Sequence, residues 1–193
     1  MAEIHAVFES TNMQSTGHNS KRIFSAVADV DIENGTFGYL DELADNYSNI
    51  YNFKKGAVDG KEIVVVDQPA WDCDTTKISN QRRDKFIIPA GTPFRVRVIA
   101  INDEFGISIQ GITEGTRDVV TVVDDFKATK VYVTIDATGK LVASTTKADN
   151  ALFEGKIERK RVVGAKLNTP IREYGYSYVL YEVRVLTAKG GNC

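Results

Sequence analysis

The stretch KFIIPAGTPFRVRVIAINDEFGISIQGI, from Lys85 to Ile112, contains two runs in which apolar and other residues alternate. Successive side chains of an extended strand point to opposite faces, so each run predicts a β-strand with two distinct faces. The second half of FRVRVIAI is apolar on both faces, which is typical of a strand covered on both sides. One face of this run consists of Phe94, Val96, Val98 and Ala100, and the other of Arg95, Arg97, Ile99 and Ile101.

Turn residues separate the predicted strands. Pro89 and Pro93 cannot donate to a sheet ladder, and Gly91 between them permits a bend, so PAGT predicts a corner. Asn34-Gly35 is typical of a tight turn, and the loop from Asp136 to Gly139 joins two β-branched segments as in a hairpin. Together with the apolar run EIVVVDQP and the segments LFEGKIERKRVVGA and YSYVLYEVRVLTA, these signals predict a mainly β fold, an antiparallel barrel or sandwich with one or two short helices.

Two segments depart from this pattern. Residues 1–22 begin with the short alternating run EIHAVFES and continue with TNMQSTGHNSKR, which lacks aliphatic residues and has little apolar surface to bury. We therefore expect a flexible N-terminal arm over residues 1–22 and a single mainly β domain over residues 23–193. Within that domain, apolar residues at three- and four-residue steps predict a helix-containing insertion at about residues 38–53.

Composition excludes several classes of protein. The 193 residues carry a formal net charge of −2, so no strong overall field favours nucleic acid or an anionic membrane as a partner. No apolar run approaches the roughly 20 residues of a membrane-spanning helix, and the N-terminus does not resemble a secretory signal. Two cysteines, Cys73 and Cys193, form no disulfide framework, which favours synthesis in a reducing cytoplasm.

The sequence contains no recognisable catalytic or metal-binding motif. His5, His18 and the two cysteines show none of the spacings of a zinc site, and no nucleophile elbow or phosphate-binding glycine loop is present. We therefore predict no catalytic residues, no metal site and no cofactor. Three acidic pairs, Asp72 with Asp74, Asp103 with Glu104, and Asp124 with Asp125, are interpreted as solvated loop charges.

Two further features allow more than one interpretation. The basic run KIERKRVVG, with Lys156, Arg159, Lys160 and Arg161, divides its charges between two strand faces and is typical of a solvated sheet edge protected against unwanted pairing. Trp71 is the only tryptophan; core packing, an interface anchor and a sugar-stacking platform are all compatible with its Pro-bounded segment.

Several segments together resemble the capsid decoration, or cement, proteins of tailed bacteriophages, over about residues 7–183. They are VFEST, ADVDIENGTFGYL, VVVDQPAWD, RRDKFIIPAGTPFRVRV, DEFGIS and RVVGAKL…YGYSYVLYEV. The resemblance implies a β-rich protein that binds the outer surface of an assembled head and bridges major capsid subunits. It implies a virion location after synthesis in the host cytoplasm, with the major capsid protein as partner. Proteins of this kind bind as monomers or as trimers, so self-association is a second expectation.

On this interpretation the partner-binding residues are expected in the arm and beside the tryptophan, namely Ile4, Val7, Phe8, Asn12 and Trp71. An arm that orders on docking adds backbone pairing to a partner's sheet. The alternatives are another phage virion component, such as a tail, head-fibre or connector subunit, and a carbohydrate-binding module. The latter would use Trp71 with Tyr174, Tyr176 and Tyr178.

Overall fold

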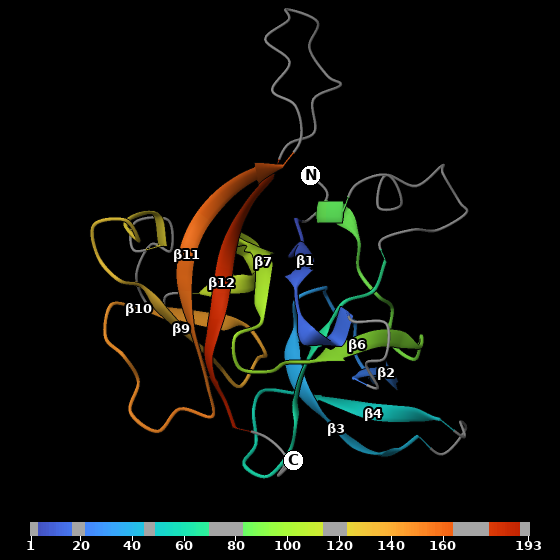
Figure 1. Cartoon of the computed structure of the whole chain (residues 1–193). Coiled ribbons are helices and arrows are strands. Elements are labelled where there is room, and N and C mark those ends of the chain that lie inside the picture. Colours follow the sequence, from blue (N-terminus) through green and yellow to red (C-terminus); the bar gives the residue numbers. More distant parts are fainter. Residues whose placement is uncertain are drawn as a thin grey trace, which may run out of the picture.

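The computed structural model describes residues 4–16, 22–44, 49–69, 83–113, 123–163 and 178–189. Within these ranges the chain forms twelve strands and three 3₁₀ helices, which confirms the mainly β prediction (Figure 1). The elements are β1 (Phe8–Asn12), η1 (Gln14–Thr16), β2 (Ile23–Val27), β3 (Phe37–Leu43), β4 (Ile50–Lys55), β5 (Ile63–Val66), η2 (Arg83–Lys85), β6 (Phe94–Val98), β7 (Glu104–Ser108), η3 (Ile109–Gly111), β8 (Ile112–Thr113), β9 (Tyr132–Ile135), β10 (Leu141–Ser144), β11 (Phe153–Val163) and β12 (Tyr178–Ala188).

The strands form two units. Five of them close into a barrel in the order β2-β4-β3-β5-β6, and the other seven form a sheet in the order β1-β7-β12-β11-β9-β10-β8. Only η3 separates β7 from β8, although they stand second and last in the sheet. Because three residues span at most roughly 10 Å, the sheet must curl so that its two ends approach each other. Figure 1 shows the long, curved β11–β12 pair that carries much of this curvature.

The sequence of β5 explains how the two units share a core. Val64 and Val66 point into the barrel, while Ile63 and Val65 point outward into a second core that also contains the inner face of the seven-stranded sheet. All four side chains are buried, so this strand reads as a continuous apolar run and not as an alternating one. β6 keeps the predicted alternation, because Phe94, Val96 and Val98 fill the barrel and its two arginines face away from that core.

A glycine turn fastens the sheet to the barrel. The predicted hairpin loop after β9 places Gly139 at φ 80°, where its carbonyl accepts a hydrogen bond from the Phe37 N–H at 2.8 Å. A Cβ atom at Gly139 would lie 2.4 Å from the Phe37 carbonyl oxygen and 2.8 Å from the Thr36 methyl carbon. Only glycine therefore combines this backbone conformation with this close approach. The Asp136 carboxylate accepts the N–H groups of Thr138 and Lys140, which orders the turn.

The insertion predicted to be helical is a pair of antiparallel strands. β3 pairs with β4 on one side and with β5 on the other, so the helix prediction is wrong over residues 38–43 and 50–53; residues 45–48 lie outside the described residues. The three-residue spacing of Leu40 and Leu43 was compatible with a helix, but both pair with β4, opposite Phe53 and Tyr51, while the beginning of the same strand pairs with the more distant β5. Such non-local pairing overrides weak local helix propensity.

The N-terminal segment also differs from expectation over residues 4–16, which are part of the folded body. β1 pairs with β7, and Val7, Phe8 and Met13 are buried. The Phe8 ring contacts the Phe105 ring, with a centroid distance of 5.3 Å. The segment is polar because an edge strand needs only one apolar face; a single phenylalanine and two smaller residues hold it in place.

A groove between the edge strand and the barrel

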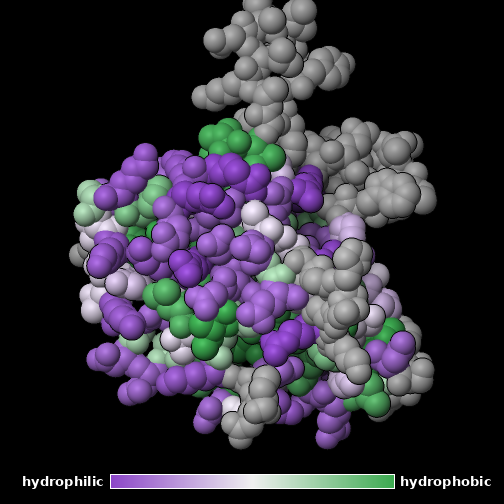
Figure 2. Space-filling view, in the orientation of Figure 1, coloured by the Kyte–Doolittle hydropathy of each residue, from purple (hydrophilic) through white to green (hydrophobic). Residues whose placement is uncertain are grey.

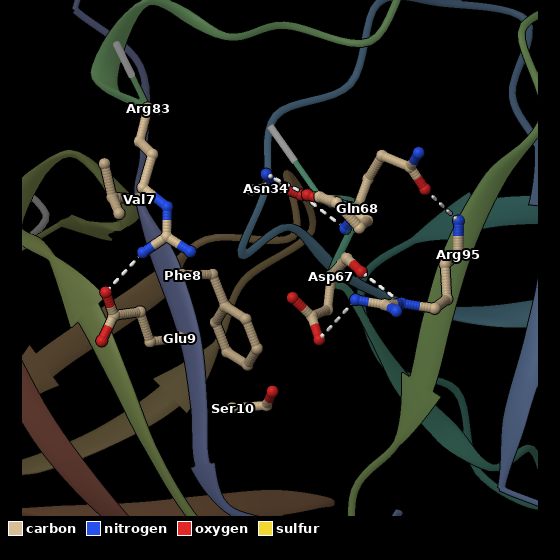
Figure 3. A pocket seen from close by; sticks show the side chains of 10 residues that line it. Val7, Phe8, Glu9, Ser10, Asn34, Asp67, Gln68, Arg83 and Arg95 are labelled. Carbon is tan, nitrogen blue, oxygen red and sulfur yellow. Dashed lines mark hydrogen bonds and ion pairs between the residues drawn. The ribbon is translucent and has the colours of Figure 1, made fainter. Parts of the chain in front are cut away.

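A cavity of about 410 Å³ lies beside β1, where the two units meet. One side is formed by four consecutive residues, Val7 to Ser10, together with Arg83 of η2. The opposite side comes from the barrel: residues 67–69 directly follow β5, and Arg95 lies on β6. Figure 3 shows Glu9 and Arg83 facing Asp67, Gln68 and Arg95 across this space. We call it the β1 groove.

Side-chain amides build the barrel wall of the β1 groove. Asn34, in the predicted Asn-Gly turn, donates to the Gln68 carbonyl and accepts from the Gln68 N–H, both at 2.9 Å. The Gln68 side-chain oxygen in turn accepts from the Arg95 N–H at 3.0 Å. The amide of Asn34 thus acts as a substitute strand partner for the chain leaving β5, and it fixes this wall without a further strand.

Asp67 is held between two arginines. Its carboxylate accepts from Arg95 at 3.3 Å and from the Nε of Arg97, and Arg95 Nε also donates to the Asp67 carbonyl at 2.7 Å. Arg97 is buried and reaches the Ser15 carbonyl at 3.2 Å, so it ties η1 to the barrel. The alternation that points both arginines away from the barrel core therefore places them around one carboxylate.

A second ionic cluster covers the opposite rim. Arg161 donates from Nε to Glu182 and from Nη2 to Glu9, at 2.7 Å each. Glu9 and Glu182 lie on either side of Gly106 in neighbouring strands, because both pair with it in the sheet register. The missing side chain at Gly106 leaves space over which the guanidinium of Arg161 spans the two carboxylates.

The same cluster holds Glu9 in its charged form. Its Oε1 accepts from the Tyr178 hydroxyl at 2.8 Å and from Arg83 Nη1 at 2.5 Å. Burial raises the pKa of the Glu9 carboxyl, but the hydrogen bonds from Arg161 and Tyr178 and the charges of Arg83 and Arg161 outweigh it, so its pKa lies below the ordinary value. Burial is the main cause that raises the pKa of Tyr178. Both groups therefore titrate further from neutral pH than usual.

These pKa directions do not suit proton transfer. A general acid or base works best when its pKa lies near the working pH, with a free position for the proton. Both oxygens of Glu9 are occupied by donors, and its pKa is shifted away from neutrality. Among the described residues, no group of three or more His, Cys, Asp or Glu side chains could hold a metal ion. What the β1 groove offers is hydrogen-bonding capacity and two partly exposed arginines.

The residues predicted to bind a partner are not brought together. Val7 and Phe8 are buried residues that line the groove, with 2% and 4% of their surface exposed. Ile4 is 52% exposed and Asn12 is exposed at the far end of β1. Trp71 lies outside the described residues, as do Tyr174 and Tyr176 of the carbohydrate-binding alternative. The Tyr178 hydroxyl is engaged by Glu9.

The predicted loop charges also have different fates. Asp103 is only 1% exposed and accepts from the N–H groups of Gln14 and Ala100 at 2.8 Å, so its interpretation as a solvated charge is wrong. Its carboxylate satisfies backbone donors of the turn before β7 and of η1. Asp124 is exposed but accepts from Lys160 and from the Tyr181 hydroxyl, both at 2.6 Å. Asp72 and Asp74 lie outside the described residues.

The basic run of β11 behaves as an edge along only part of its length. Its first half pairs with both β12 and β9, whereas residues 158–163 pair only with β12 among the described strands. Arg159 and Lys160 are exposed there, and Val162 is 56% exposed. The face seen in Figure 2 is mostly hydrophilic, with apolar side chains in separate small groups.

Comparisons of the chain with protein-family models, with curated proteins and with solved structures found no match. Within the described residues, no helix is long and apolar enough to span a membrane.

Proposed function

We propose that this protein is a non-enzymatic structural component of a tailed-bacteriophage particle. In this proposal it binds the outer surface of the capsid and stabilises contacts between major capsid subunits. The choice of a capsid as the larger assembly comes from the resemblance of segments such as ENGTFGYL and RRDKFIIPAGTPFRVRV to decoration proteins. The choice of adhesion over catalysis comes from the geometry of the ionic clusters.

One observation carries the adhesive assignment: each of the two carboxylates that line the β1 groove is paired with two arginines. Glu9 is shared by Arg83 and Arg161, and Asp67 by Arg95 and Arg97. Paired and hydrogen-bonded in this way, they hold separate segments of the chain together, and both oxygens of Glu9 already accept hydrogen bonds from donors of the chain. Such a site supports recognition of a partner surface better than it supports turnover.

A shared core supports the same proposal. A decoration protein must transmit tension between capsid subunits without yielding, and here the barrel strands β3 and β5 contribute Phe37, Ile63 and Val65 to the apolar core of the seven-stranded sheet. Many weak contacts repeated over a symmetric shell then give strong net attachment. No free arm is required, because the segment Phe8–Asn12 belongs to the sheet.

Quantitative mass spectrometry of purified particles from a phage that encodes the chain tests the proposal. The expected result is a fixed, high copy number relative to the major capsid protein. Particles lacking the gene should lose density on the head in electron-microscopy maps and should open at a lower temperature. Absence of the chain from intact particles would refute the proposal, and density on the tail would favour the alternative virion component.

A further inference from the structure

The free side of β1 offers backbone groups for pairing. β1 stands at the end of the seven-stranded sheet and pairs only with β7 among the described strands. Val7 directs both peptide groups toward β7, because its carbonyl accepts from the Ser108 N–H and its own N–H donates to the Ser108 hydroxyl. In antiparallel pairs the direction alternates from residue to residue, so the peptide groups of Phe8 point to the other side. That side is the β1 groove.

A bulge extends this opening. The register passes from Glu9 opposite Gly106 to Asn12 opposite Glu104, so Ser10 and Thr11 together oppose Phe105. Since the alternation directs the peptide groups of Phe105 toward β12, neither bulge residue has a regular ladder partner in β7. An unpaired row of this kind is a template for an added strand.

The size of the β1 groove suits a short extended chain. Four consecutive residues line it, Val7 and the first three residues of β1, which corresponds to a length of roughly 10 Å at the rise of a strand. Its volume of about 410 Å³ lies within the usual range of ligand pockets. The opposite wall is fixed by the Asn34–Gln68 pair of hydrogen bonds.

The charge of the β1 groove favours an acidic group. The side chains of Arg83 and Arg95 are 48% and 34% exposed, and both line the cavity. The two carboxylates that line the cavity, Glu9 and Asp67, are also paired with Arg161 and Arg97 from outside the lining, so they do not fully neutralise Arg83 and Arg95. Arg83 uses one nitrogen for its interactions with Glu9 and Tyr178. The guanidinium fork is suited to a carboxylate of a ligand.

We propose that the β1 groove binds an extended, acidic segment of a partner protein. The segment pairs with β1 as an added strand and places a carboxylate against Arg83 and Arg95. This inference deepens the proposed function, from which it takes only that the partner is a protein. A free inorganic anion would use the arginines alone, whereas an extended segment uses them together with the outward peptide groups of β1.

Binding of blocked hexapeptides to the full chain, measured by isothermal titration calorimetry, tests the proposal. The probe alternates threonine and valine with one central glutamate; a second peptide carries glutamine instead, and a third is the first with alternate amides N-methylated. We expect saturable binding of the glutamate peptide, weaker binding of the glutamine peptide, and none of the N-methylated peptide. R83Q should weaken the glutamate peptide by about fivefold to tenfold. It should leave the glutamine peptide unchanged.

Matched variants separate the charge from the strand pairing. Lys61→Gln removes one exposed positive charge of the barrel that contacts Asp41 and does not line the groove, so it should not change affinity. Ser10→Pro removes an N–H of the bulge that has no ladder partner in β7, and should abolish binding, whereas Ser10→Ala should retain it. If the proline variant does not fold, the N-methylated peptide makes the same test from the side of the probe.

Three results would overturn the proposal. The first is no saturable binding of the glutamate peptide at about 1 mM. The second is equal binding of the N-methylated peptide, which would indicate an anion site without strand pairing. The third concerns residues 70–82, which lie outside the described residues but connect Pro69 and Arg83 of the groove lining. Residues 71–81 can be replaced by an equally long glycine-serine linker. If the glutamate peptide binds only after this replacement, the chain's own segment occupies the groove and a partner does not. Each result leaves the particle experiment unaffected, so the two proposals fail separately.

Discussion

Replacement of Gly139 by alanine should loosen the attachment of the sheet to the barrel. The change has two effects that add. An alanine at φ 80° is strained by roughly 1–2 kcal/mol. Its Cβ would also lie 2.4 Å from the Phe37 carbonyl oxygen, so the turn must move and the hydrogen bond between the Gly139 carbonyl and the Phe37 N–H weakens. Loss of that bond adds about 0.5–1.5 kcal/mol, before any loss of packing.

Two other glycines provide the control for this prediction. Gly60 and Gly91 have φ values of 77° and 74°, and nothing lies within 4 Å of a Cβ built on either. Gly60→Ala and Gly91→Ala should therefore show the strain without the steric contact. We expect the Gly139 variant to be less stable than either control by at least about 1 kcal/mol, or roughly 2–4 °C in Tm for a chain of this size.

Urea denaturation followed by circular dichroism and by tyrosine fluorescence measures the difference. If the turn couples the barrel to the seven-stranded sheet, the Gly139 variant should unfold less cooperatively. Its unfolding transitions measured by circular dichroism and by fluorescence should then no longer coincide, or its m-value should fall. Equal destabilisation in all three variants would refute the argument that the contact with Phe37 fastens the units together.

Three further predictions concern the first strand and the ionic clusters. Phe8→Ala should destabilise the fold by about 3–5 kcal/mol because the ring is buried against Phe105, whereas Asn12→Ala should change stability by less than about 0.5 kcal/mol in the same denaturation assay. The lowered pKa of Glu9 means that its stabilising contribution is present above the unfolded pKa, near 4.5, and is lost as the pH falls through the folded pKa; Glu9→Gln should flatten this part of the curve of stability against pH. Burial and the hydrogen bond to Asp124 raise the pKa of Tyr181, so its contribution to stability is present below the unfolded pKa, near 10, and is lost as the pH rises through the folded pKa. Tyr181→Phe should reduce this loss of stability at alkaline pH, and ultraviolet titration of the tyrosines follows the ionisation.

Strands in which apolar and polar residues alternate could be predicted from the sequence, because the two faces of such a strand have different environments. β6 is the clearest example: its apolar residues fill the barrel, and Arg95 and Arg97 face away from that core toward Asp67. The turns at Asn34-Gly35 and after Asp136 were predicted for the same local reason, since their glycines adopt positive φ. Local chemistry decides such features, and local chemistry is visible in the sequence.

The edge strand and the strands β3 and β4 could not be predicted because strand pairing, which the local pattern does not show, decides their conformation. Leu40 and Leu43 have a spacing that suits a helix, but in the sheet they lie opposite Phe53 and Tyr51 of β4. Phe8 is a single large apolar residue among polar neighbours, so the adjacent sequence does not indicate that its ring packs against Phe105. Contacts with other strands decide both cases.

The β1 groove was missed for the same reason. Glu9 and Arg161 are 152 positions apart and meet only because β1, β7, β12 and β11 are consecutive in the sheet. The one local signal was the pair of arginines in FRVRV. Charged residues that alternate with residues of the barrel core lie on the face away from that core, and they need a carboxylate partner on their own face. Asp67, directly after the apolar run of β5, is that carboxylate, and the pairing of β5 with β6 brings the two together.

The position of the β1 groove between the two units bears on how the protein withstands force. Its walls belong to different sheets, yet Ile63 and Val65 of the barrel lie in the same core as the strands of the larger sheet. The walls therefore cannot separate without exposing that core to water, which opposes opening by roughly 25 cal/mol for each Å² of apolar surface exposed. A partner segment bound in the groove would meet a site of nearly fixed width, so little binding energy is lost in ordering it. Pulling on that segment would load β1 and its neighbours, which places the load on the hydrogen-bond ladder between β1 and β7 and on the ion pairs from Arg161 to Glu9 and Glu182.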